Sequence, residues 1–232
     1  MATSGTYGFN PSLGDVVLNA YALAQVKRTA LVAQHMADAR TQSNMLLSEW
    51  SNRQVNLWTV ELIETPLLEG VATYAVDPNI VMILDAYIRI DNGGGSLQDR
   101  VIMPISRTDY ASYPNKELQG FPTVFWFNRL INPTITLWTV PNEDDYFTLR
   151  YYACRQIQDA ELANGLNLEI PYRWLDAFTT GLAWRLSLIH NPEVSDRLEK
   201  LMNRSWEIAA GQDTENVPIA IVPGLNSYYR YR

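Results

Sequence analysis

The sequence is poor in the residues that disulfide, metal and nucleic-acid chemistry require. Its 232 residues include one cysteine, Cys154, so no disulfide can form within the chain, and a reducing compartment is expected. The two histidines, His35 and His190, belong to no H-x-x-x-H or C-x-x-C pattern, and we interpret both as structural. The 18 basic residues are outnumbered by 25 acidic ones, for a net charge of −7. Because binding to phosphates needs clustered Lys and Arg, an independent DNA-binding domain is disfavoured.

Long apolar runs are also missing. No stretch approaches the roughly 20 apolar residues of a membrane helix, and the first residues lack the basic and apolar regions of a secretion signal. We therefore expect a soluble protein made in the cytoplasm. What the chain does have is 47% apolar residues, with 7 Trp and 13 Tyr, which predicts a packed core in one domain or two small lobes.

Helical periodicity occupies both ends of the chain. Ser12 and Asp15 have the spacing of a helix-capping pair, and apolar residues then recur every three or four positions to about residue 24, and again from 32 to 50. This predicts two helices with a break within 26–33. A second pair is predicted at about 174–189 and 194–208, separated by the cap and first-turn proline of Asn191-Pro192.

Between the two helical regions the apolar pattern alternates with a period of two. Residues 58–156 are rich in β-branched and aromatic side chains, which predicts about six short antiparallel strands. The segment "DNGGGSLQD" (91–99) has the Asn and Gly that supply positive φ angles, so a hairpin loop is expected there.

The expected fold is therefore α+β. A four-helix α-helical core would comprise residues 1–57 and 165–211, with an antiparallel β-rich lobe inserted at 58–164 and an extended C-terminal tail at 212–232. Four amphipathic helices each have one apolar stripe to bury, and a small bundle buries all four. Trp50 and Trp58 flank the passage from helix to strand, so we expect them to pack the junction between the lobes.

Candidate catalytic groups are few. No base lies near Cys154 in the sequence, and we interpret it as a buried, inert thiol. Residues 93–95 lack the Lys and Ser/Thr of a phosphate loop, and residues 143–145 ("EDD") lack the ligand spacing of a calcium loop, so both are interpreted as turns. We predict no catalytic residue, no metal site and no cofactor.

The C-terminal tail combines an apolar run, Ile219–Val222, with Tyr and Arg at its end. An unpaired apolar segment of high β-propensity is an aggregation hazard, and Tyr and Arg are favoured as interface anchors. These features favour docking of the tail on another subunit over a frayed terminus.

Four blocks carry a resemblance to a known family: "HMADARTQSNMLLSEWSNRQVNLWTVEL", "MPISRTDYASYPNKELQGFPTVFWFNR", "PYRWLDAFTTGLAWRLSL" and "IVPGLNSYYR". In this order and spacing they resemble the head-to-tail adaptor proteins of short-tailed bacteriophages, also called tail-accessory or tail tubular A-type proteins. The resemblance runs from about residue 35 to residue 230. None of the blocks is a catalytic signature, so the match depends on their order.

The resemblance implies a structural virion protein at the head-to-tail interface, made in the host bacterial cytoplasm. Such adaptors join as a twelve-membered ring beneath the portal, extend the DNA channel, help to retain packaged DNA and support the tail nozzle or fibres. The DNA passes through without sequence-specific binding. The implied contacts with a neighbouring subunit or the nozzle are Arg107, Asp109 and Tyr110. The implied portal-binding residues are Ile219, Ile221, Val222, Leu225, Tyr228, Tyr229 and Arg230.

Two alternative functions stay open on the sequence alone. A virion-associated cell-wall hydrolase would need two carboxylates in a cleft, and Glu49, Glu61 and Glu64 lie near the helix-to-strand junction. A carbohydrate-binding or receptor-binding β module would present aromatic residues such as Trp126, Trp138 and Tyr146 in line on one exposed sheet face. Alternating burial on the two faces of a sheet explains these aromatic residues equally well, and we favour it.

Overall fold

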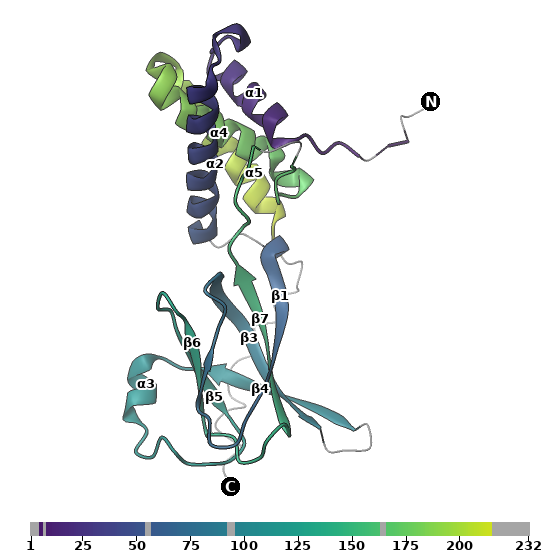
Figure 1. Ribbon diagram of the computed structural model, residues 1–232, viewed down its shortest axis with the longest axis vertical. Coiled ribbons are helices and arrows are strands. Elements are labelled where there is room, and N and C mark those ends of the chain that lie inside the picture. The colour runs from purple at the N-terminus through teal and green to yellow at the C-terminus, as the bar shows by residue number, and fades with distance from the viewer. Residues whose placement is uncertain (1–4, 7, 54–56, 92–95, 163–165, 215–232) are drawn as a thin grey trace.

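The computed structural model describes residues 5–6, 8–53, 57–91, 96–162 and 166–214 (Figure 1). The fold is α+β: within these residues a mixed sheet of seven strands curls into a half-barrel and is accompanied by five α-helices. Four of the helices gather at one end of the molecule and the sheet lies at the other end (Figure 1). None of the helices in the described ranges is both long enough and apolar enough to cross a membrane.

The predicted helices and their break are confirmed. The four helices are α1 (Leu13–Leu23), α2 (Ala33–Arg53), α4 (Leu175–His190) and α5 (Ser195–Gln212). Ser12 caps α1 by accepting a hydrogen bond from the backbone N–H of Asp15. A short 3₁₀ turn at Arg28–Ala30 occupies the predicted break between α1 and α2.

Helix α4 is the centre of the helical core, and α1, α2 and α5 all pack against it. Its residues Phe178, Leu182 and Leu186 are fully buried. At Gly181 a Cβ atom would lie 3.1 Å from a methyl carbon of Leu46, so the glycine allows α2 and α4 to approach closely. The bundle is thus built on the apolar stripe predicted for residues 174–189.

The sheet has the strand order β1-β7-β3-β4-β5-β6-β2. Its strands are β1 (Val60–Pro66), β2 (Thr73–Ala75), β3 (Ile80–Asp91), β4 (Leu97–Pro104), β5 (Val124–Asn128), β6 (Thr134–Trp138) and β7 (Phe147–Arg155). β3 and β4 pair as the predicted hairpin, whose loop residues 92–95 lie outside the described residues. One face of the sheet holds a second core that includes Ile88, Leu149 and Phe125.

The expectation that all strands run antiparallel is wrong at one pairing. Strand β4 pairs with β5 in parallel, Met103 with Val124 and Pro104 with Phe125. The connection between them is long and carries helix α3 (Arg107–Ser112). A short turn would have forced the next strand to run antiparallel, whereas this connection brings the chain back to the same end of the sheet.

The last described residues, 213 and 214, lie just past residue 212, where the C-terminal tail is predicted to begin. Helix α5 extends to Gln212, and Asp213 is still buried, with its carboxylate bound to Arg173. The rest of the predicted tail, from residue 215 onward, lies outside the described residues.

Four indole rings join the helical core to the start of the sheet. Trp174 is fully buried, and its ring centroid lies 4.9 Å from that of Trp50, 5.5 Å from that of Trp58 and 4.9 Å from that of Trp206. The indole N–H of Trp58 donates to the backbone carbonyl of Glu169 at 3.0 Å. Trp58 stands immediately before β1, so this cluster fixes where the sheet leaves the bundle.

Replacement of Trp174 tests the importance of this cluster. We expect Trp174→Ala to lower the free energy of unfolding by about 3–5 kcal/mol, because it leaves a cavity among three other indoles. Leu188→Ala in helix α4 removes a side chain that is 51% exposed and should cost less than about 0.5 kcal/mol. Urea denaturation followed by circular dichroism measures both, and equal losses would contradict a central role for Trp174.

Candidate functional site

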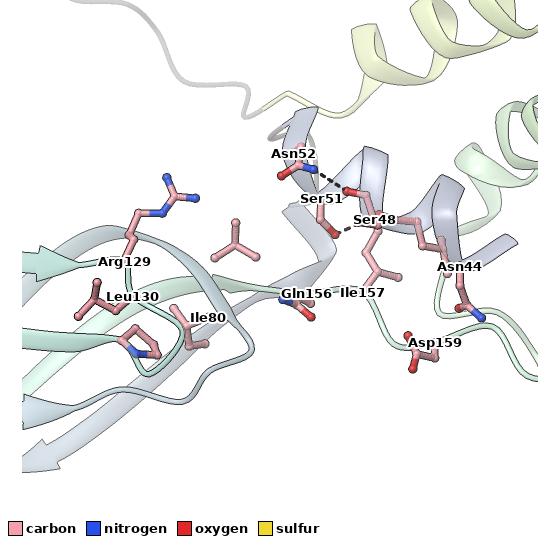
Figure 2. A pocket seen from close by; sticks show the side chains of 13 residues that line it. Asn44, Ser48, Ser51, Asn52, Ile80, Arg129, Leu130, Gln156, Ile157 and Asp159 are labelled. Atoms are coloured by element: carbon pink, nitrogen blue, oxygen red, sulfur yellow. Dashed lines mark hydrogen bonds between the residues drawn. The ribbon is translucent and has the colours of Figure 1, made fainter. Parts of the chain in front are cut away.

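A cleft of about 320 Å³ opens between helix α2 and the sheet (Figure 2). Helix α2 contributes polar side chains to it, and the start of β3, the turn between β5 and β6 and the segment after β7 supply the other side. The described lining residues are Asn44, Leu47, Ser48, Ser51, Asn52, Ile80, Val81, Arg129, Leu130, Pro133, Gln156, Ile157 and Asp159.

The side chains of Asn44, Ser51 and Asn52, three of the polar residues that α2 places in this cleft, are bonded within the protein. Ser51 donates to the carbonyl of Leu47 and Asn52 to that of Ser48, both at 3.1 Å. Asn44 exchanges two hydrogen bonds with the backbone of Ala160, at 3.1 and 2.7 Å. These last bonds pin the segment after β7 to α2, so the cleft is a seam where the two parts of the fold are held together.

The described lining of the cleft does not bring two carboxyl groups together. Among its described lining residues Asp159 is the one carboxylate and Arg129 the one cation. Hydrolysis of a glycosidic bond typically uses two facing carboxyl groups. The described lining therefore lacks the second of them.

The three glutamates near the helix-to-strand junction are each engaged by an arginine. Glu49 binds Arg53 and, at 2.5 Å, Arg185. Glu64 binds Arg150 across the β1–β7 pair, and Glu61 lies 3.7 Å from Arg155. Each of these carboxylates is occupied by an arginine, and none of the three is among the described residues that line the cleft.

Glu169 is the junction carboxylate that the sequence did not indicate. It accepts two hydrogen bonds from the guanidinium of Arg155, one of them at 2.9 Å, and a third from the backbone N–H of Gln158 at 2.9 Å. These bonds, that from Arg155 above all, hold the pKa of Glu169 below its usual value. Arg155 ends strand β7 and Glu169 precedes α4, so the pair ties the sheet to the helical core.

The two histidines lie against each other at the opposite end of the bundle. The rings of His35 and His190 are stacked with their centroids 4.5 Å apart, and Nε2 of His190 is 3.2 Å from a carboxylate oxygen of Asp38. Burial, with a smaller effect from Asp38, raises the pKa of Tyr21 to about 12. The protonated phenol of Tyr21 donates to the carbonyl of His35 at 2.5 Å. The histidines thus join α1, α2 and α4, as expected of structural residues.

The remaining candidate groups occupy structural positions. Burial raises the pKa of the Cys154 thiol, which disfavours the reactive thiolate. In the acidic turn, Asp144 accepts a hydrogen bond from the backbone N–H of Glu69 at 2.6 Å. Across the described ranges, no group of three or more His, Cys, Asp or Glu side chains is placed to hold a metal ion.

The residues assigned to a neighbour or nozzle contact lie on α3. The carboxylate of Asp109 accepts bonds from the backbone and hydroxyl of Ser106, forming a capping box, and these bonds lower its pKa. The ring of Tyr110 stacks on Trp126 with centroids 5.6 Å apart. Arg107 is exposed. Asp109 and Tyr110 therefore hold α3 in place, and Arg107 is the member of the set most open to a partner.

The aromatic residues considered for carbohydrate binding are covered by the chain itself. Trp126 lies beneath Tyr110, and Trp138 is stacked on Tyr113 with centroids 4.2 Å apart and planes 2° apart. Tyr146 meets Phe147 edge-on. The first two indoles share a face of the β5–β6 pair, but α3 and the residue after it occupy that face, which disfavours its use for stacking on sugars.

A row of exposed apolar side chains on β4 was not anticipated. Leu97, Val101 and Met103 are 54%, 74% and 63% exposed, and their spacing places them on one face of the sheet. In "LQDRVIMP" apolar residues fall on both faces of the strand, with Ile102 buried and Val101 and Met103 on the opposite, exposed face. The sequence predicts a strand here but does not predict which of its two faces lies outward.

The residues predicted to bind a portal lie outside the described residues: Ile219, Ile221, Val222, Leu225, Tyr228, Tyr229 and Arg230. No protein-family model and no characterised protein matches this sequence.

The lowered pKa of Glu169 predicts an acid-sensitive junction. A carboxylate whose pKa is depressed by folding contributes stability above its unfolded pKa and loses it as pH falls through the folded value. We therefore expect the free energy of unfolding to fall less steeply below about pH 4–5 in Glu169→Gln than in the original chain. Denaturant titrations between pH 7 and 3 provide the measurement. Glu161→Gln, at a carboxylate that is 57% exposed, is the control and should leave the pH profile unchanged.

Proposed function

We propose that the chain is a structural virion protein, a head-to-tail adaptor that forms a ring beneath the phage portal. The ring would hold twelve copies, as in the family that the sequence resembles, and would extend the DNA channel, help to retain the genome and support the nozzle or fibres. The observation that carries the proposal is the apolar row on β4, because exposed apolar patches are typical of surfaces that bind another protein.

The row on β4 continues onto the strands beside it. Val101 is paired with Tyr87 of β3, and Tyr152 of β7 and Leu62 of β1 are 42% and 37% exposed on the same side of the sheet. Two cross-strand ion pairs, Arg89 with Asp99 and Arg150 with Glu64, lie among these residues. Covering such paired charges with a neighbouring subunit costs less free energy than covering unpaired charges would, so these ion pairs are compatible with an interface.

The helical end also exposes large apolar side chains. Val32 and Met45 are 59% and 55% exposed, Leu188 and Ile189 of α4 about half exposed, and Ile208 of α5 62% exposed. A ring subunit has a neighbour on each side and a partner above it. Exposed apolar side chains at both ends of the molecule are therefore expected of a ring subunit more than of a monomeric enzyme.

The finer architecture follows from this role. The four-helix core would face the portal, the β lobe inserted between its halves would face the nozzle, and the extended tail at 212–232 would reach the portal through Ile219 to Arg230. The net charge of −7 favours a channel wall that repels the DNA backbone, so the genome passes without specific binding.

Sedimentation with purified portal rings tests the function. We expect the chain alone to sediment as a monomer and to join a large complex only when portal is added. A variant lacking residues 215–232 should stay folded, because Asp213 and its bond to Arg173 are retained, and should no longer join the complex. A full-length chain that ignores the portal would refute the proposal, and unfolding of the truncated chain by circular dichroism would show that the tail belongs to the core.

The apolar row can be tested separately from the tail. Val101→Glu and Met103→Glu should fold normally, since both side chains are largely exposed, but should weaken ring assembly on the portal. Losing about 2 kcal/mol of apolar burial at each contact corresponds to roughly thirtyfold weaker association. Ile131→Glu, in the turn between β5 and β6 at a site that is 93% exposed, is the matched control. Assembly equal to that of the control would remove β4 from the interface.

A further inference from the structure

A groove runs along the outside of the helical core between α1 and α5, with α4 between them. It has a volume of about 640 Å³, and its apolar lining includes Phe9, Val16, Leu23, Leu175 and Leu201. A second hollow of about 470 Å³ shares Leu23 and Leu201 with it and extends along α5. The two hollows thus adjoin at Leu23 and Leu201, and the second is flanked by the basic side chains of Arg197, Lys200 and Arg204.

The chain leaves α5 at one end of this groove. Asp213 is 5% exposed, and its carboxylate accepts a hydrogen bond from Nε of Arg173 at 2.9 Å and another from its Nη2. Arg173 is itself one of the residues that line the groove, and its neighbour Tyr172 lies at the rim beside Phe9, with ring centroids 6.4 Å apart. Residues beyond 214 thus start from the rim of an apolar groove.

The apolar run Ile219–Val222 is within reach of this groove. Ile219 is six residues beyond Asp213, which spans up to about 20 Å of extended chain. Helix α1, one wall of the groove, has 11 residues and is therefore about 16 Å long. The run can accordingly be placed anywhere along the wall of the groove without detaching Asp213 from Arg173.

The composition of the run suits an apolar groove. Ile219, Ile221 and Val222 are β-branched and carry no polar side-chain atoms. Pro218 and Pro223 bracket the run and have no N–H group, so fewer backbone donors would need a partner on entering the groove. Burying an apolar side chain of this size contributes about 1.5–3 kcal/mol.

We propose that residues 219–222 of the chain's own C-terminal segment occupy the groove between α1 and α5 in the free protein. The segment then shields the apolar lining of the groove, and the groove shields the segment from aggregation. This inference does not depend on the adaptor function. In an adaptor, the same residues would have to leave the groove before they could bind a portal.

Disulfide trapping in the full-length chain tests this placement. In a Cys154→Ala background, Asn19→Cys on the exposed rim of the groove is combined with Ala220→Cys, which leaves Ile219 and Ile221 unchanged. The control pair is Ile131→Cys with Ala220→Cys, at a fully accessible position on the sheet lobe. Oxidation is followed on non-reducing gels and by peptide mass spectrometry, at a concentration where the chain is monomeric.

We expect the disulfide at position 19 to form within one chain, at least tenfold faster than at position 131, and to slow to the control rate when Ile219→Asp and Ile221→Asp are added. Equal rates at positions 19 and 131 would overturn the proposal. A fast disulfide that joins two chains would also overturn it, because the occupant of the groove would then be a second copy. A fast disulfide that is indifferent to the two Asp substitutions would refute apolar docking of the run.

Discussion

The indole of Trp174 is the contact on which the arrangement of the two lobes depends. It is fully buried and touches one tryptophan from α2, one from α5 and one from the entry to β1. Aromatic rings packed at such distances bury large areas and have preferred mutual angles, so they resist both separation and twisting. The Arg155–Glu169 ion pair and the Asn44–Ala160 bonds act at the same seam. A bundle and a sheet joined only by loops would be free to hinge, whereas here apolar and polar contacts restrain the junction together.

Much of the helical architecture could be read from the sequence because its signals are local. The cap at Ser12, the break near Arg28 and the stripe through Phe178 all depend on residues within a few positions of each other. The parallel pairing of β4 and β5 could not be read in this way. It depends on where α3 settles, and α3 is held by the stacking of Tyr110 and Tyr113 on rings that follow more than ten residues later. Alternating apolar residues predict that a segment forms a strand, but they do not predict which strand lies beside it.

The candidate site residues show the same difference between local signals, which the sequence carries, and contacts that only the fold creates. Trp50 and Trp58 could be assigned to the junction because the chain changes from helical to strand periodicity between them. Their partner Trp174 was apparent only as a member of a helical stripe, since nothing local says which tryptophans meet. Nothing near Glu169 in the sequence indicates its role, because that role depends on hydrogen bonds from Arg155 and Gln158 that form in the folded protein. For the row on β4, the sequence predicts the strand but not which of its faces points outward. The outward face is set by the register of β4 with β3.

Glu169 at the junction and the apolar row on β4, which the sequence did not indicate, are connected in what they imply for function. A rigid junction means that contacts made by the β lobe and contacts made by the helical end are presented at a fixed spacing. When two contacts are held at a fixed spacing, the second forms at the high effective concentration set by the first. Weak apolar surfaces at the two ends of one subunit could then support a stable ring, although neither would hold two free monomers together. In the proposed adaptor, each apolar patch would be too small to join two free monomers, and a partner ring would be needed to align the copies.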